Sequence, residues 1–219
     1  MIVAFVPATP LLSPAVSVTD VGVAAVQTAA RGVVADLVAA GAGVVVVGEA
    51  PEQRDYTGTW DWSGFGIRSR GTPGDALPRA LSVGAWLLDD AGWDGPRRFV
   101  GVPAATTPDD CAALGRGLDA SALLVVADGS ARRSLKAPGH LDERAEPFDA
   151  AIAAALAGAD LPALGALDLG LAAQLLATGR AAWQVAAGAC VDRGWEPELL
   201  LAEAPYGVAW FVARWRSSE

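Results

Sequence analysis

The chain has 219 residues, of which 53% are hydrophobic and 19% charged, which is enough apolar material to bury a large core. Its formal net charge of −9 argues against nucleic acid or an anionic membrane surface as a partner, because both attract a basic face. The two cysteines, Cys111 and Cys190, lack CxxC spacing and exclude a zinc site of the cysteine type.

The first predicted element is a strand over residues 2–6, a continuous apolar run of the kind that is buried on both faces of a sheet. The run has no basic residues before it and meets Pro7 early, so we expect a first strand and not a signal peptide. No uncharged apolar run reaches the roughly 18 to 20 residues of a membrane span. A cytoplasmic protein with reduced cysteines is therefore expected.

A helix follows, capped at Thr19 or Asp20 and ending near Ala40, and residues 44–47 form the next buried strand. The segment 52–76 is then long, irregular and rich in glycine and aromatic residues, and loops of this length are usually functional. Its aromatic residues indicate an ordered lid over a pocket or a contact with another subunit, and packing onto the chain's own core is an equal alternative. The aromatic side chains concerned are Trp60, Trp62 and Phe65.

The second half of the chain alternates between expected helices and strands. Helices are expected over 78–90, 107 to about 117, 148–156 and 168–177, and strands over 98–102, 123–126, 199–202 and 208–215. Residues 183–189 fit either a strand or a buried helix, because the periodicity of this short apolar run does not decide. The alternation predicts an α/β fold, with one three-layer domain over 1–219 and a mostly parallel, mixed sheet covered by helices on both faces.

Four of the strands end in compact polar loops, over 7–10, 48–51, 128–132 and 203–207. The carboxyl ends of parallel strands lie at one edge of a sheet, so we expect these loops to converge on one crevice. The polar candidates for ligand binding there are Glu49, Asp128, Ser130, Arg132, Glu203 and Tyr206.

The segment Asp128-Gly129-Ser130 precedes two arginines, Arg132 and Arg133, and this combination suits an anion held by backbone N–H groups and guanidinium groups. An equal alternative is that the arginines pair with nearby acidic residues, namely Asp142, Glu143 or Glu146. Ser130 is a poor candidate for a nucleophile, because it lacks the G-x-S-x-G context. The sole histidine, His140, lies in the following loop and is expected to be solvated.

The order and spacing of these segments resemble the class III extradiol ring-cleavage dioxygenases, the LigB-like family that includes the catalytic B subunit of protocatechuate 4,5-dioxygenase. The family has a late Glu-Ala-Pro-Tyr-Gly-Val-Gly segment and a mid-chain Gly-Asp-Leu-Ser-His segment. The matching segments here are Glu203-Ala204-Pro205-Tyr206-Gly207-Val208-Ala209 and Ala127-Asp128-Gly129-Ser130-Ala131-Arg132, followed by Ala137-Pro138-Gly139 and Glu146-Pro147-Phe148-Asp149. The resemblance covers most of the chain outside the 52–76 loop.

The resemblance implies an iron site that this chain does not keep. In the family, two histidines from the first two loops and the late glutamate bind Fe(II), and a mid-chain histidine transfers protons. The corresponding positions here are Ala8, Ala50, Glu203 and Ala131, so Glu203 is the one retained metal ligand. With one histidine in the chain, ordinary Fe(II) ring cleavage is not expected, and neither is an iron cofactor.

The first hypothesis is therefore a non-catalytic or altered-function relative that binds a small anionic or aromatic ligand, or a peptide. The second is an enzyme that uses another metal, held by Glu203 with Glu49, Asp128 or Asp61, or that completes its site with a second subunit. The third is a subunit-contact protein, possible as a homo-oligomer, that acts through the loop over 60–65. A simpler role for Glu203 is an ion pair with an arginine such as Arg132.

Overall fold

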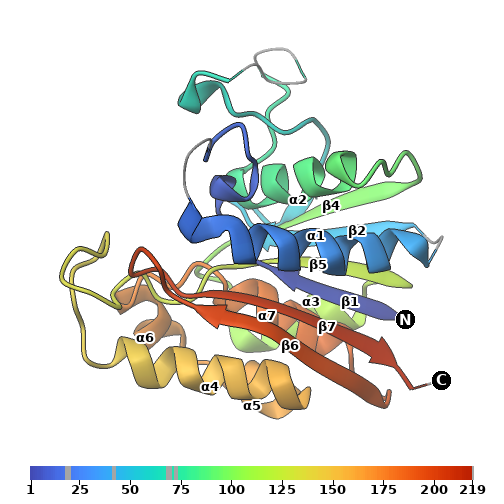
Figure 1. Ribbon diagram of the computed structural model, residues 1–219. Coiled ribbons are helices and arrows are strands. Elements are labelled where there is room, and N and C mark those ends of the chain that lie inside the picture. The colour runs from blue at the N-terminus through green and yellow to red at the C-terminus, as the bar shows by residue number, and fades with distance from the viewer. Residues whose placement is uncertain (18–20, 41–42, 68–70, 72–73, 219) are drawn as a thin grey trace.

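A computed structural model describes residues 1–17, 21–40, 43–67, 71 and 74–218. In this part of the chain, seven strands form one sheet in the order β3-β4-β2-β5-β1-β7-β6 (Figure 1). The strands are β1 (Ile2–Val6), β2 (Val44–Glu49), β3 (Arg54–Tyr56), β4 (Arg97–Val102), β5 (Ala122–Val126), β6 (Trp195–Glu203) and β7 (Trp210–Ser217). The four central strands are parallel, and β3 and β7 run against their neighbours. The predicted mostly parallel, mixed sheet is confirmed.

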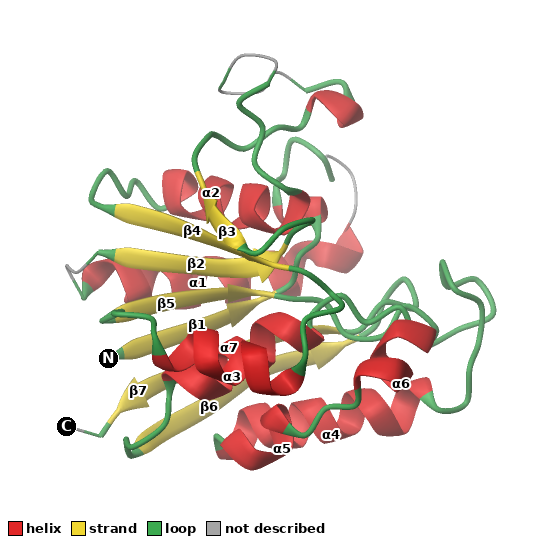
Figure 2. Ribbon diagram, turned by 180° about the vertical axis from the view of Figure 1, so that it is seen from behind, coloured by secondary structure: helices red, strands yellow, loops and turns green. Residues whose placement is uncertain are grey.

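Helices cover both faces of this sheet and give the predicted three layers. α1 (Ala24–Ala39) and α2 (Arg79–Asp90) lie on one face (Figure 1), and the remaining α-helices lie on the other (Figure 2). That second group is α3 (Pro108–Arg116), α4 (Ala145–Gly158), α5 (Leu161–Gly165), α6 (Leu169–Gln174) and α7 (Arg180–Ala189). None of the described helices is long and apolar enough to span a membrane.

The continuous apolar runs become the central strands because both faces of the sheet are buried. In β1, Ala4 and Val6 join the core beneath α1 and α2, whereas Val3 and Phe5 join the core on the opposite face. Successive side chains of a strand point to opposite faces, so a strand between two helical layers needs an apolar residue at every position.

Two glycines allow α3 and α7 to cross in close contact. A Cβ atom at Gly188 of α7 would lie 2.4 Å from the carbonyl oxygen of Ala112, and one at Gly115 of α3 would lie 2.1 Å from that of Val185. Real Cβ atoms do not approach backbone oxygens so closely, so any larger residue would push these two helices apart.

The structure corrects several of the predicted boundaries. Residues 183–189 belong to helix α7 and not to a strand, and the helix predicted over 168–177 is the shorter α6. The 52–76 segment contains the edge strand β3, and the helix α5 was not predicted at all. The proposed helix cap at Thr19 or Asp20 lies outside the described residues.

The edge strand β6 is longer than the predicted 199–202 because its first half is polar. Glu196 and Glu198 are exposed, Pro197 stands between them, and a register shift occurs between Leu199 and Leu201. Proline is confined to the edges of sheets because it has no N–H to donate. The apolar pattern was therefore visible only in the second half of the strand.

Candidate functional site

The carboxyl ends of β1 and β2 meet a cavity of about 560 Å³. Ala8 follows β1 and Ala50 follows β2, and the structure places both in the wall of this cavity, as converging loops would require. Most of the wall is apolar, and its charged side chains are Glu49 and Arg79. The other lining residues are Pro51, Pro78, Ala80, Pro103, Ala104, Ala105, Val126 and Thr178. We call this cavity the Ala8–Arg79 crevice.

Asp128 is hydrogen-bonded to Ala8, which lines the crevice. Its Oδ1 accepts a hydrogen bond of 2.8 Å from the backbone N–H of Ala8, which joins the loops that follow β1 and β5. Burial raises the pKa of the Asp128 carboxyl to about 6, and the neighbouring charge of Glu49 adds to this. The Ala8 N–H and the guanidinium of Arg79 act in the opposite direction. Asp128 therefore changes its charge in a mildly acidic range.

Glu49 and Arg79 face the crevice without a fixed partner. Among the described residues, neither side chain takes part in an ion pair or a side-chain hydrogen bond. Burial raises the pKa of the Glu49 carboxyl, while Arg79 and Arg180 lower it. Arg79 is exposed at the first position of α2. The crevice thus presents charges of both signs to a ligand.

Arg180 and Thr178 also belong to this region, and sequence reasoning missed both. Arg180 is 2% exposed and donates to the carbonyl oxygens of Ala104 and Thr106 and to Gln184, so it fixes the loop that follows β4. The hydroxyl oxygen of Thr178 is buried and has no hydrogen-bond partner among the described residues. The signal in the sequence was that Arg180 stands alone among apolar residues, directly after Gly179. It was missed because the sequence did not decide whether residues 183–189 form a strand or a helix.

Three backbone N–H groups of the 128–132 loop, those of Gly129, Ser130 and Ala131, are used within the protein. The N–H groups of Gly129 and Ala131 donate to the carbonyl oxygens of Ala209 and Leu175, at 2.8 and 2.9 Å. The Ser130 N–H donates over 2.8 Å to the carboxylate of Asp149, a residue to which the sequence interpretation gave no role. These three donors are thus not available to an external anion.

The side chain of Asp149, on α4, accepts two hydrogen bonds from Ser130 of this loop. It is 2% exposed on the inner face of α4, and its Oδ2 accepts a hydrogen bond of 2.6 Å from the Ser130 hydroxyl. Arg133 forms ion pairs with the same Oδ2 atom, from Nη1 at 3.3 Å, and with Oε1 of Glu146, from Nη2 at 3.4 Å. The pair with Glu146 is one of the ion pairs expected for the arginines of this segment. Ser130 is fully buried, so its hydroxyl is closed to a substrate and does not serve as a nucleophile in this conformation. An acidic residue within the buried apolar spacing of α4 was the signal for Asp149.

Glu203 does not lie in the Ala8–Arg79 crevice. It is exposed at the end of β6 and lines a second cavity of about 540 Å³ together with Arg133, Glu146 and Asp149. Ala131 lines neither cavity. The four positions that the resemblance assigns to iron ligands and the proton-transferring residue are therefore divided, and only Ala8 and Ala50 share a wall. Within the described part of the chain, no group of three histidine, cysteine or acidic residues is placed to hold a metal ion.

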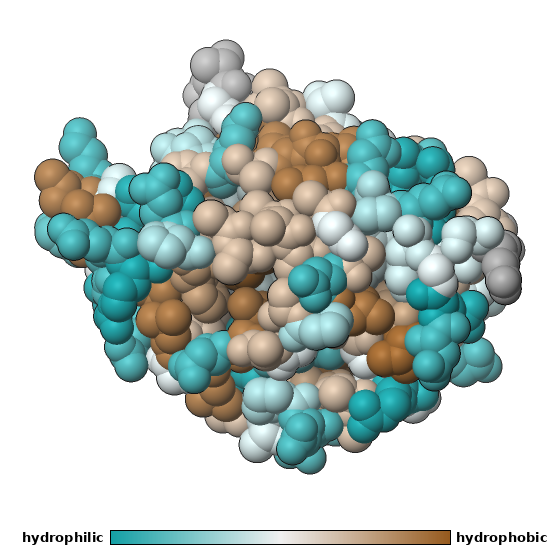
Figure 3. All heavy atoms as spheres, turned by 90° about the horizontal axis from the view of Figure 1, so that it is seen from below, coloured by the Kyte–Doolittle hydropathy of each residue, from teal (hydrophilic) through white to brown (hydrophobic). Residues whose placement is uncertain are grey.

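The remaining candidates of the mid-chain and late motifs are on a protruding loop and the adjoining hairpin. Arg132 donates to the carbonyl oxygen of Gly139 at 2.5 Å, and His140 is exposed, as expected, with a positive φ of 60°. Tyr206 is 39% exposed and packs edge-on against Trp210. Viewed from below, the protrusion carries hydrophobic atoms near its end (Figure 3). None of these three side chains lines the Ala8–Arg79 crevice.

The aromatic loop packs beside α2. Trp62 is 2% exposed in the core, Trp60 donates from Nε1 to Asp89 over 2.9 Å, and Phe65 is 55% exposed. Asp89 lies ten residues along α2 from Arg79, about 15 Å at 1.5 Å per residue. Trp60 is thus anchored toward the end of α2 that is remote from Arg79, and none of the three aromatic side chains lines the Ala8–Arg79 crevice.

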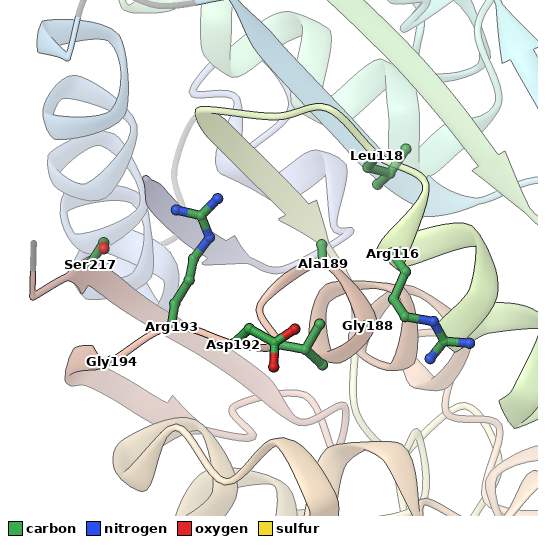
Figure 4. A pocket seen from close by; sticks show the side chains of 10 residues that line it. Arg116, Leu118, Gly188, Ala189, Asp192, Arg193, Gly194 and Ser217 are labelled. Atoms are coloured by element: carbon green, nitrogen blue, oxygen red, sulfur yellow. The ribbon is translucent and has the colours of Figure 1, made fainter.

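A further cavity, of about 780 Å³, lies at the opposite edge of the sheet, where α3 and α7 end (Figure 4). Its charged side chains are Arg116, Asp192 and Arg193, all exposed. The two guanidinium groups extend away from each other on either side of Asp192 (Figure 4). The carboxyl ends of helices carry partial negative charge, which disfavours an anion. Together with the separation of the two guanidinium groups, this makes the cavity a poor site for an anion.

Cys111 and Cys190 are both fully buried, as expected for inert thiols. Burial raises the pKa of both, and that of Cys190 reaches about 12. Thiols with such pKa values stay protonated at neutral pH and are poor nucleophiles.

Comparison of the sequence with models of protein families gives no match, and no curated protein matches it.

Proposed function

We propose that this chain is an iron-free relative of the class III extradiol dioxygenases whose crevice binds a small molecule and does not cleave an aromatic ring. The observation that carries the proposal is that Ala8 and Ala50, at the positions assigned to two metal-binding histidines, line one cavity at the carboxyl edge of the sheet. A crevice at this edge of a parallel sheet is the usual place for a ligand. Methyl groups in place of imidazoles leave room for a ligand and supply no metal donor.

The residues present do not fit Fe(II). Ala8 and Ala50 have no donor atoms, and Glu203 lines a different cavity from both. His140 is exposed on the protruding loop and lines neither cavity. A site for Fe(II) and dioxygen needs two imidazoles and a carboxylate that converge on one point.

Metal analysis of the purified protein, combined with an oxygen-uptake assay on protocatechuate, tests this proposal. The protein is measured as isolated and again after anaerobic incubation with Fe(II), followed by gel filtration. We expect iron well below one equivalent and no oxygen uptake above that of buffer with Fe(II). Stoichiometric iron together with ring opening would overturn the proposal.

A second candidate function is contact with another subunit through the aromatic loop, and the exposure of Phe65 favours it. Phe65 is 55% exposed while its ring packs edge-on against the buried Trp62 at 6.4 Å, so an apolar ring in contact with the core is open to solvent. Aromatic residues are enriched at protein interfaces. Phe65→Ser is expected to lower the mass in light scattering, and Leu135→Ser, at a residue 67% exposed, serves as the control. Equal masses for wild type and Phe65→Ser would exclude this function.

A further inference from the structure

The Ala8–Arg79 crevice combines charges of both signs, and the described residues leave these charges without ion-pair partners. Glu49 and Arg79 line the cavity, and Asp128 accepts a hydrogen bond from the backbone N–H of Ala8 in its wall. The three groups are close enough for Arg79 to stabilise the charged forms of both carboxylates. A simple anion would be repelled by the two carboxylates, and a simple cation by the guanidinium. A ligand that carries both signs avoids both penalties.

The positive side of the crevice lies at the start of α2. Pro78, Arg79 and Ala80 all line the cavity, and the helix has no side-chain cap at its N-terminus. The N–H groups of a first helical turn and the helix dipole favour a carboxylate, and the guanidinium adds a charge-assisted donor.

The negative side is formed by Glu49, with Asp128 behind it. Burial raises the pKa of both carboxyl groups, which means that their charged forms are poorly solvated in the protein alone. A bound ammonium group would stabilise those charged forms. Arg180 also lowers the pKa of Glu49, but it does not line the cavity. Its guanidinium group donates hydrogen bonds to Gln184 and to the carbonyl oxygens of Ala104 and Thr106.

Between the charged groups, the wall is alanine, proline and valine, which suits the apolar body of a small molecule. We propose that the crevice binds a small zwitterion of the free amino-acid class, with its carboxylate at Arg79 and the start of α2 and its ammonium group at Glu49. This inference rests on the proposed function, since it assumes that the crevice is the ligand site.

Three probes with the same apolar body test the proposal by calorimetry at pH 7.5. L-Phenylalanine carries both charges, 3-phenylpropionate lacks the ammonium group, and 2-phenylethylamine lacks the carboxylate; L-leucine is a second zwitterion. We expect phenylalanine or leucine to bind at least tenfold more tightly than either singly charged probe. Equal binding of phenylpropionate would show a simple anion site, equal binding of phenylethylamine a simple cation site, and either result would overturn the proposal. Failure of both zwitterions to bind would overturn it as well.

Two variants that each remove one charge locate the charged groups of the ligand. Arg79→Gln is expected to weaken the zwitterion at least tenfold, the loss of about one charge-assisted hydrogen bond, and Glu49→Gln is expected to do the same. Arg116→Gln and Glu196→Gln make the same changes at exposed residues outside the crevice and should leave binding unchanged. Unchanged binding in both crevice variants would exclude this cavity as the site. Because iron content and ring cleavage are measured without these probes, failure here is distinct from failure of the proposed function.

Discussion

The side-chain carboxylate of Asp128 accepts a hydrogen bond from the backbone N–H of Ala8 over 2.8 Å. The two residues are 120 positions apart in the chain, and this bond joins the loops that follow two paired parallel strands, β1 and β5. A group with a pKa near 6 therefore helps to hold the wall of the ligand cavity.

Asp128→Asn should remove a pH-dependent part of the stability. Because the folded-state pKa is raised from 3.8 to about 6, the folded protein keeps a proton that the unfolded chain releases between these values. Stability due to this group is fully present below pH 4 and is lost as pH rises toward 6. The asparagine amide oxygen can still accept the Ala8 N–H, so the variant should exceed wild type at pH 7 by at most about 3 kcal/mol.

Urea denaturation of both proteins at several pH values between 4 and 8 measures this difference. The stability gain of Asp128→Asn over wild type should grow from pH 4 to pH 6 and then stay constant. A difference that is independent of pH would show that Asp128 has an ordinary pKa in the folded protein.

Ser130→Ala should destabilise the fold by about 1.5–3 kcal/mol, because the buried carboxylate of Asp149 loses the hydroxyl donor at 2.6 Å. Thermal denaturation gives the change, and Ser121→Ala, at an exposed serine, is the control with an expected change within about 0.5 kcal/mol. A loss no larger than that of the control would mean that the Ser130 hydroxyl does not support Asp149.

Gly188→Ala should destabilise the protein by about 1–3 kcal/mol, since the new methyl group would meet the Ala112 backbone at the crossing of α3 and α7. The matched control is Gly32→Ala on α1, where nothing lies within 4 Å of the added Cβ. There the better helix propensity of alanine should stabilise the protein by about 0.5–1 kcal/mol. Opposite signs are thus expected for the same substitution in two helices, measured by chemical denaturation.

Much of the fold was accessible from the sequence because its central strands are buried on both faces. Runs such as 2–6, 44–47 and 123–126 are apolar at every position and short, and they leave little choice but a strand. The periphery was harder to predict. In β6 the polar first half faces solvent, and α7 is packed on nearly all sides, so neither element shows the amphipathic pattern that sequence interpretation relies on.

The site was only partly accessible for a different reason. Loops at strand ends identified Ala8, Glu49, Ala50 and Asp128, because the topology of a parallel sheet brings such loops together. The same rule could not show that Glu203 lines a separate cavity, because Glu203 ends an antiparallel edge strand. Arg79 and Thr178 sit at helix starts, where the sequence gives no sign of which side chains turn toward a neighbouring loop.

The polar half of β6 has a consequence for how the molecule behaves at high concentration. An edge strand of nine residues could recruit a strand from another chain and extend the sheet without limit. Pro197, the register shift after Leu199 and the flanking glutamates make that edge a poor template for such growth. Assembly at the β6 edge is therefore expected to use side-chain surfaces and not continuous β-pairing, which protects this edge against fibrous aggregation.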